Sequence, residues 1–216
     1  CGERVFDTGY TEQDKDLSGP PFRIDGGGGQ RIKVTGLTLG STSKTGLSSL
    51  RRGNGRLAIK QVGFKNPAGG MNIKVDAIGL SGDTKEDGGN IIFLANYSLQ
   101  AVKVNESNYG PAELTLDFGN IPAVVAARLK QGLQEIRRQK LPQQQQGMAM
   151  LSVLMDVGPD LLKANPKLAI KHLYVKTPDG DVEGNMSVAA NGMLWSDIGN
   201  MQTVLGKLNA DASVRI

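Results

Sequence analysis

The sequence has one cysteine and one histidine among 216 residues. One cysteine excludes an internal disulfide and a thiolate metal cluster, and one histidine excludes most hydrolytic triads and zinc sites. No apolar run approaches the ~20 residues that span a membrane. The net charge of +4 is too small and too scattered for a dedicated nucleic-acid-binding protein. The sequence therefore predicts a non-enzymatic protein with no metal, no other cofactor and no nucleic-acid partner.

Aromatic residues make up only 5% of the chain, whereas glycine supplies 29 residues. This balance favours turn-rich β structure over a helical bundle. We expect residues 1–30, which are polar and rich in glycine and proline, to form an extended lead-in. Residues 31–216 are expected to form a single α+β domain, and the strand-like end at 211–216 suggests a fragment truncated at its C-terminal end.

Alternating apolar and polar residues predict a largely antiparallel β-meander. The alternation changes phase near Gly36, as at a bulge. The glycines of Gly53-Asn54-Gly55 predict a hairpin turn between strands over 47–52 and 56–64. Further strands are expected over 71–77, 91–104, 114–118, 168–177 and 181–190, the last two joined by the turn at Pro178-Asp179-Gly180.

Helical spacing of apolar residues predicts a helix over 121–140 and a second one up to residue 164, kinked or restarted at Gly158-Pro159. A short third helix is expected near 198–208. We expect the first helix to lie on the sheet through Val125, Leu129, Leu133 and Ile136. The predicted fold class is α+β, with a curved β-meander sheet and two or three amphipathic helices packed on it.

Two surfaces are candidates for binding. The strands carry more apolar surface than two or three helices could cover, which indicates a site for a lipid or other apolar ligand. Its candidate residues are Met71, Ile73, Val75, Ile91, Phe93, Leu114, Leu116, Val182, Met186 and Val188. The basic face of the first helix is a candidate for contact with an anionic membrane surface, and a solvated face is the competing interpretation. Its residues are Arg128, Lys130, Arg137, Arg138 and Lys140.

His172 is the one candidate for acid–base chemistry. Alternation places it on the strand face of Leu168, Ile170 and Tyr174, where a structural histidine is the simpler interpretation. Gly26 to Gly29 lack the Lys-Ser/Thr and the following helix of a phosphate loop. Asp179, Asp181 and Glu183 match a hairpin turn better than a calcium loop.

Two segments carry a family resemblance: LLKANPKLAI at 161–170 and VKTPDGD at 175–181. With GPAEL at 110–114 and LNADASVRI at 208–216, the chain resembles the YdgA-like family of uncharacterised bacterial envelope proteins over residues 20–216. The resemblance implies an extracytoplasmic protein tethered to a bacterial membrane by an N-terminal helix, and it implies no catalytic residues.

Cys1 followed by Gly2 predicts instead the start of a lipoprotein that is cleaved before its lipidated cysteine, and an artificial start is the alternative. Either tether would place the protein in the periplasm.

The leading prediction is a non-enzymatic envelope protein that binds a lipid or other apolar ligand on its curved sheet. The alternative is a structural module, without a small ligand, that forms a homo-oligomer or scaffolds partners through the face or edge of the sheet. An enzyme is the third interpretation and would require a cleft in which His172 meets a carboxylate.

Overall fold

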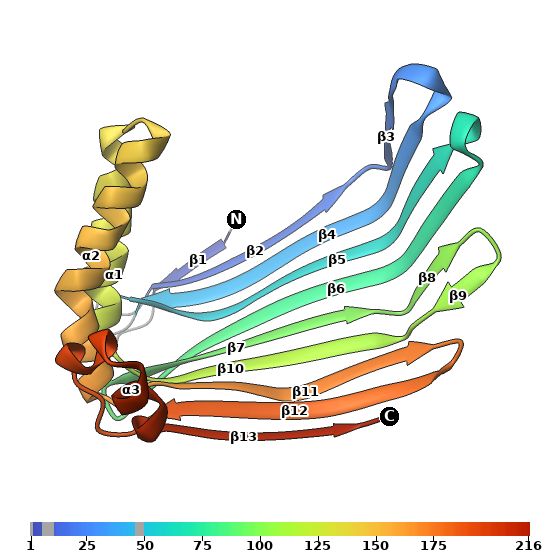
Figure 1. Ribbon diagram of the computed structural model, residues 1–216. Helices are drawn as coiled ribbons and strands as arrows, with labels where there is room; N and C mark the ends of the chain where they lie inside the picture. The colour runs from blue at the N-terminus through green and yellow to red at the C-terminus, as the bar shows by residue number, and fades with distance from the viewer. Residues whose placement is uncertain (1, 6–10, 46–49) are drawn as a thin grey trace.

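A computed structural model describes residues 2–5, 11–45 and 50–216. In this part of the chain, thirteen strands form one antiparallel sheet that is not closed, in the order β1-β2-β4-β5-β6-β7-β10-β11-β12-β13, with β3 beside β4, β8 beside β6 and β9 beside β8. Three α-helices lie at one end of the strands (Figure 1). The predicted α+β fold with a curved antiparallel sheet is therefore confirmed.

The strands are β1 (Gly2–Val5), β2 (Thr11–Gly19), β3 (Phe22–Asp25), β4 (Arg31–Thr45), β5 (Arg51–Asn66), β6 (Met71–Asp87), β7 (Asn90–Leu99), β8 (Ala101–Val104), β9 (Ser107–Tyr109), β10 (Ala112–Pro122), β11 (Lys167–Thr177), β12 (Gly180–Ala190) and β13 (Leu208–Arg215). The helices are α1 (Ala123–Gln139), α2 (Gln143–Lys163) and α3 (Met201–Lys207), and the 3-10 turns are η1 (Gly27–Gly29), η2 (Pro67–Gly69) and η3 (Trp195–Gly199). The lead-in expected over residues 1–30 includes β2 and β3, which both pair with β4.

Strands β4, β5 and β6 bend together towards the ends that lie away from the helices (Figure 1). Gly36 of β4 and Ala77 of β6 both have positive φ, 66° and 52°, and the apolar alternation changes phase at each. A Cβ at Gly36 would lie 2.5 Å from Cβ of Lys60, so glycine permits the close approach of β4 and β5 there. The phase change predicted at Gly36 is confirmed, but β4 and β5 keep their register across it. The break is therefore a bend rather than a bulge.

The hairpin turn predicted at Gly53-Asn54-Gly55 is wrong. These residues lie inside β5 and pair with both β4 and β6. A Cβ at Gly53 would lie 2.0 Å from the carbonyl oxygen of Thr42, so glycine allows the β4 backbone to come close. The glycines that indicated a turn serve a close strand contact instead. The connection from β4 to β5 falls on residues 46–49, outside the described residues.

Helices α1 and α2 form an antiparallel hairpin that extends away from the strands (Figure 1). They approach closely at Gly132, where a Cβ would lie 2.7 Å from the side chain of Val153. Within the described residues, α1 packs on the sheet at its beginning, where Ala123 joins Ile91 and Leu50 in a buried cluster. The expectation that α1 lies along the sheet through Leu129 and Leu133 is wrong, because α2 is its main partner. Helix α2 also runs through Pro159 without a restart.

The buried apolar core is small for the length of chain described. Its members are Leu50, Ile91, Ala95, Ala123, Val125, Val157, Ala169, Ala190 and Met193. Large apolar side chains on the strands remain exposed, among them Leu17 at 65% and Leu39 at 44%. Much of the sheet is thus a single layer that no other described element covers.

Candidate functional site

One face of the sheet carries a continuous apolar row across nine strands. The register pairs Leu39 with Leu57, Leu57 with Leu80 and Leu80 with Tyr97, and residues that pair directly share a face. The row continues in both directions to the strands at the sides of the sheet. Its members are Leu17, Leu39, Leu57, Leu80, Tyr97, Leu114, Leu173 and Val214, with Gly184 between the last two. We call these residues the apolar row.

The apolar row is long on the scale of a lipid. Nine neighbouring strands at a spacing of about 4.8 Å give a row about 38 Å long. One leaflet of the hydrocarbon core of a bilayer is about 15 Å thick. The ends and the middle of the row reach solvent, since Leu17 is 65%, Tyr97 43% and Val214 67% exposed.

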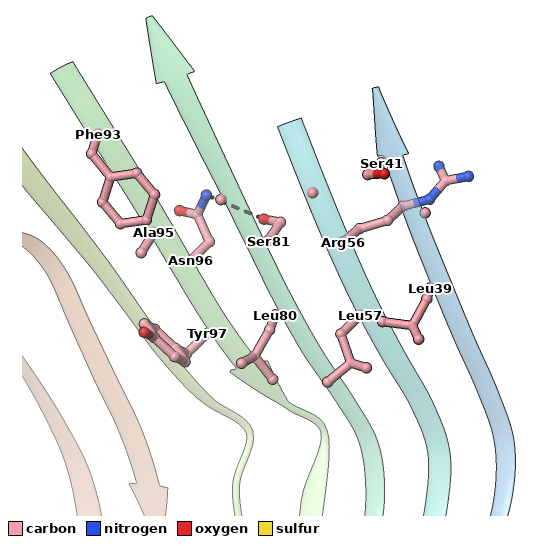
Figure 2. Close-up of a pocket in the computed structure, with 13 residues that line it drawn as sticks. Leu39, Ser41, Arg56, Leu57, Leu80, Ser81, Phe93, Ala95, Asn96 and Tyr97 are labelled. Atoms are coloured by element: carbon pink, nitrogen blue, oxygen red, sulfur yellow. Dashed lines mark hydrogen bonds between the residues drawn. The ribbon is translucent and has the colours of Figure 1, made fainter. Parts of the chain in front are cut away.

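Beside the apolar row, four small residues form a second row across β4 to β7. Ser41 pairs with Gly55, Gly55 with Gly82, and Gly82 with Ala95. A Cβ at Gly55 would meet nothing within 4 Å. The missing side chains leave a hollow of about 400 Å³ lined by both rows and by Phe93. Figure 2 shows Leu39, Leu57, Leu80 and Tyr97 following one another along one side of this hollow.

A second hollow of about 310 Å³ lies next to the first, because Leu80 and Tyr97 line both. Its exposed lining is mostly apolar and includes Leu99, Leu114 and Val175. Both volumes are typical of small-ligand sites, although these hollows are open to solvent. We call the two hollows together the apolar trough.

The opposite face of the same strands is polar. Arg56 donates to Asp16 at 3.1 Å, and this pair crosses Gly40 of the intervening strand. A Cβ at Gly40 would lie 2.5 Å from Arg56 Nε, so glycine leaves room for the pair. Asn96 donates to Ser81 Oγ at 3.4 Å and accepts from Thr115 Oγ1 at 2.9 Å (Figure 2 shows the first of these bonds). The contrast between the two faces makes the sheet amphipathic rather than apolar throughout.

The structure divides the ten predicted apolar residues into three groups. Six lie on the face of the apolar row: Phe93, Leu114, Leu116, Val182, Met186 and Val188. Met71, Ile73 and Val75 lie beyond the bend of β6 at Ala77. Ile91 is buried against Ala123, so it has no surface to offer to a ligand.

Sequence reasoning missed the part of the trough formed by β4 and β5. Leu39, Leu57 and Gly55 line the trough, but Gly55 was assigned to a turn. The alternation of Leu57 and Ile59 along β5 was available as a signal. Glycine within that alternation indicates a strand whose neighbour or ligand approaches closely.

The face predicted for His172 needs correction. Between β10 and β11 the register shifts, so that Thr115 pairs with His172 and Leu116 with Ile170. This bulge turns Leu168 and Ile170 towards the apolar row and leaves His172 and Tyr174 on the polar face. The two rings stack there with centroids 6.4 Å apart. His172 Nε2 lies 3.5 Å from Glu113 Oε2, with the histidine side chain 42% exposed, and His172 also lines an open, polar hollow of about 290 Å³ together with Glu183 and Arg215.

The predicted basic face of α1 is also divided. Arg128 pairs with Asp156 at 2.9 Å and with Asp160 at 2.7 Å on α2, so it joins the two helices and is not available to a membrane. The hydrogen bonds that Arg128 donates to the carboxylates of Asp156 and then Asp160 raise the pKa of Arg128 above its ordinary value. Arg137 and Lys130 are exposed, and Arg138 lies 3.8 Å from Glu135.

Among the described residues, three carboxyl groups have pKa values below the usual value, each for a local reason. Hydrogen bonds from Gln61 and then Lys74 lower the pKa of Asp76. A hydrogen bond from Arg128 lowers the pKa of Asp160. Lys207 and the backbone N–H of Leu194 lower the pKa of Asp197. These groups are anions held in place by donors, which is a structural role and leaves none of them poised as a general base near neutral pH.

Two kinds of feature are absent from the described residues. No group of three or more His, Cys, Asp or Glu side chains there is arranged to hold a metal ion. In the same part of the chain, no helix is both long and apolar enough to cross a bilayer. Cys1, the predicted lipidation site, lies outside the described residues.

Comparison with known proteins gives one match. A family model described as a bacterial protein of unknown function (DUF945) matches residues 3–216. The chain belongs to this family. No curated protein and no solved structure matches the chain. Membership in DUF945 agrees with the resemblance to an uncharacterised bacterial family and assigns no activity to the apolar trough.

Proposed function

We propose that this DUF945 chain is a non-enzymatic protein of the bacterial envelope that binds the acyl part of a lipid, or a similarly long apolar ligand, in the apolar trough. The single observation that carries the proposal is the continuous apolar row, exposed at Leu17, Tyr97 and Val214. Exposed apolar patches of this extent on a protein surface mark interaction sites. The resemblance to YdgA-like envelope proteins supports a periplasmic location and a membrane tether.

The shape of the trough favours an elongated ligand. Glycines at 55 and 82 form a floor beside the apolar row, and the ring of Phe93 lies against Gly82, where a Cβ would come within 3.4 Å of it. A methylene chain can follow such a row because it requires no hydrogen-bond partner. Each buried methylene contributes about 0.8 kcal/mol, so a chain that covers several strands would bind measurably.

The experiment is a titration with cis-parinaric acid, a long-chain fatty acid that fluoresces when it leaves water. The test variant is Gly55→Leu, because a side chain at this position enters open space inside the first hollow and obstructs it. We expect the wild-type protein to bind and the variant to bind at least about tenfold more weakly. No binding by the wild type, or equal binding by both proteins, contradicts the proposal.

Gly63→Leu is the matched control for this titration. Gly63 lies on the same strand, β5, and a Cβ there also meets nothing within 4 Å. It lies beyond the bend, away from the residues that line the two hollows. We expect Gly63→Leu to bind cis-parinaric acid like the wild type, and both variants to unfold at the same temperature.

A second candidate is self-association through the same face. The exposure of Leu39 and Val214 at opposite sides of the sheet would suit contact with another copy. Light scattering separates the two candidates. A dimer that dissociates on Gly55→Leu, combined with no binding of cis-parinaric acid, favours self-association.

A further inference from the structure

Helix α2 has an apolar face that no described element covers. Its inner side faces α1, through Val153 beside Gly132 and through Asp156 beside Arg128. The outer side carries Met148, Met150, Leu151, Leu154 and Met155, which are all exposed, with Met148 at 71% and Met155 at 55%. We call these five residues the outer α2 face.

The charges in the outer part of the α1–α2 hairpin are almost all positive. Residues 141–155 contain no charged side chain, and residues 129–140 contain four cations and the single anion Glu135, which gives a net charge of +3 over 129–155. The cations are Lys130, Arg137, Arg138 and Lys140, and all four are exposed. The acidic residues Asp156 and Asp160 lie nearer the sheet and are paired with Arg128. The end of the hairpin away from the sheet is therefore both apolar and cationic.

We infer that the outer part of the α1–α2 hairpin, residues 130–155, docks on an anionic lipid bilayer. The outer α2 face would enter the boundary between headgroups and acyl chains, and the α1 cations would contact anionic headgroups. Exposed Met and Leu on α2, combined with exposed Lys and Arg on α1, are features of helices that lie at a membrane interface. Cations near an anionic surface add attraction that weakens with salt.

The outer part of the hairpin is a surface distinct from the apolar trough, and its docking on a bilayer does not depend on ligand binding in the trough. A docked hairpin would hold the sheet beside a membrane, which is where a lipid-binding trough would be useful. The tests of the two proposals use different variants, so either proposal can fail alone. In particular, Gly55→Leu should leave bilayer binding unchanged.

The first test is flotation of the full chain with vesicles made of equal amounts of phosphatidylcholine and phosphatidylglycerol, at low salt. The variant Leu151→Gln with Met155→Gln removes two apolar side chains from the outer α2 face. We expect its binding to be at least about tenfold weaker than that of the wild type. Val124→Gln is the control, because Val124 is an exposed apolar residue at the other end of the hairpin, and it should bind like the wild type.

The second test reverses charge. Arg137→Glu with Arg138→Glu should weaken binding to the same vesicles at least about tenfold and abolish most of its salt dependence. Lys33→Glu with Lys65→Glu changes two exposed cations at the opposite end of the molecule and should have no effect. Circular dichroism of each variant checks that the helices form. Three results would overturn the inference: equal binding of the wild type to vesicles of pure phosphatidylcholine, unchanged binding of either test variant, or no binding of the wild type to any vesicle. The third result would favour a protein partner for the outer α2 face.

Discussion

Arg128 of α1 donates a hydrogen bond to Asp160 of α2 across 2.7 Å. Together with the second pair to Asp156, this bond joins the two helices close to the sheet. The same hydrogen bond is the main cause of the lowered pKa of Asp160. The contact therefore makes the stability of the hairpin depend on pH in a predictable direction.

The stabilising effect of Asp160 should disappear in acid. Because the folded chain holds the pKa of Asp160 below its usual 3.8, the unfolded chain binds the proton first. The contribution of Asp160 to the free energy of unfolding is fully present at pH values above that usual pKa, and it is lost as the pH falls through the pKa of Asp160 in the folded chain. We expect Asp160→Asn to lower the urea midpoint near neutral pH, and the difference from wild type to shrink below about pH 3.8.

Asp179→Asn is the control for this pH series, because Asp179 lies in the exposed turn between β11 and β12. Its urea midpoint should follow that of the wild type at every pH. A difference between Asp160→Asn and wild type that stays constant into strong acid would show that the Arg128 pair does not stabilise the hairpin.

Glycine is required at Gly53 but not at Gly55, although both lie in β5. Alanine at position 53 would place its Cβ 2.0 Å from the Thr42 carbonyl oxygen at a φ of 140°, whereas at position 55 it meets nothing within 4 Å. We expect Gly53→Ala to lower the free energy of unfolding by at least about 2 kcal/mol and Gly55→Ala to change it by less than about 0.5 kcal/mol. Urea unfolding followed by circular dichroism measures both. Equal effects of the two substitutions would argue against a continuous β5.

The single tryptophan reports on the contact between η3 and α2. A Cβ at Gly158 would lie 2.1 Å from the ring of Trp195, so Gly158→Ala must displace that ring. We expect a red shift of the tryptophan emission and a loss of about 1–3 kcal/mol in stability. Gly147→Ala on the same helix meets no atom within 4 Å and should stabilise the helix by about 0.5–1 kcal/mol without moving the emission. If Gly158→Ala leaves the emission unchanged, η3 does not pack on α2 through this ring.

Strand positions could largely be predicted from alternation, because a half-exposed strand shows its two faces in its own sequence. The pairing of residues across strands could not be predicted, since it depends on bulges and bends. The register shift at His172 turned Leu168 and Ile170 to the apolar face, and no local pattern marks the residue where that shift occurs. Six of the predicted apolar residues nonetheless lie on one face, because each was identified from alternation within a single strand.

Two other predictions were wrong for a shared physical reason. Gly53-Asn54-Gly55 fits a turn as well as a strand, because glycine provides positive φ and also close backbone approach. The apolar stripe of α1 could pack equally well on a sheet or on a second helix, because burial of the stripe requires only an apolar partner. In both cases tertiary contacts with β4 and α2 decide between alternatives that are locally equivalent.

Photo-cross-linking with a fatty acid that carries a diazirine near its methyl end tests the proposed function most directly. After irradiation with the full chain, mass spectrometry of the peptides locates the covalent adducts. We expect adducts on peptides that contain Leu57, Leu80 or Tyr97, which line the apolar trough, and their loss in Gly55→Leu but not in Gly63→Leu. Adducts confined to α2, or adducts on the trough that Gly55→Leu leaves unchanged, would contradict lipid binding in the trough.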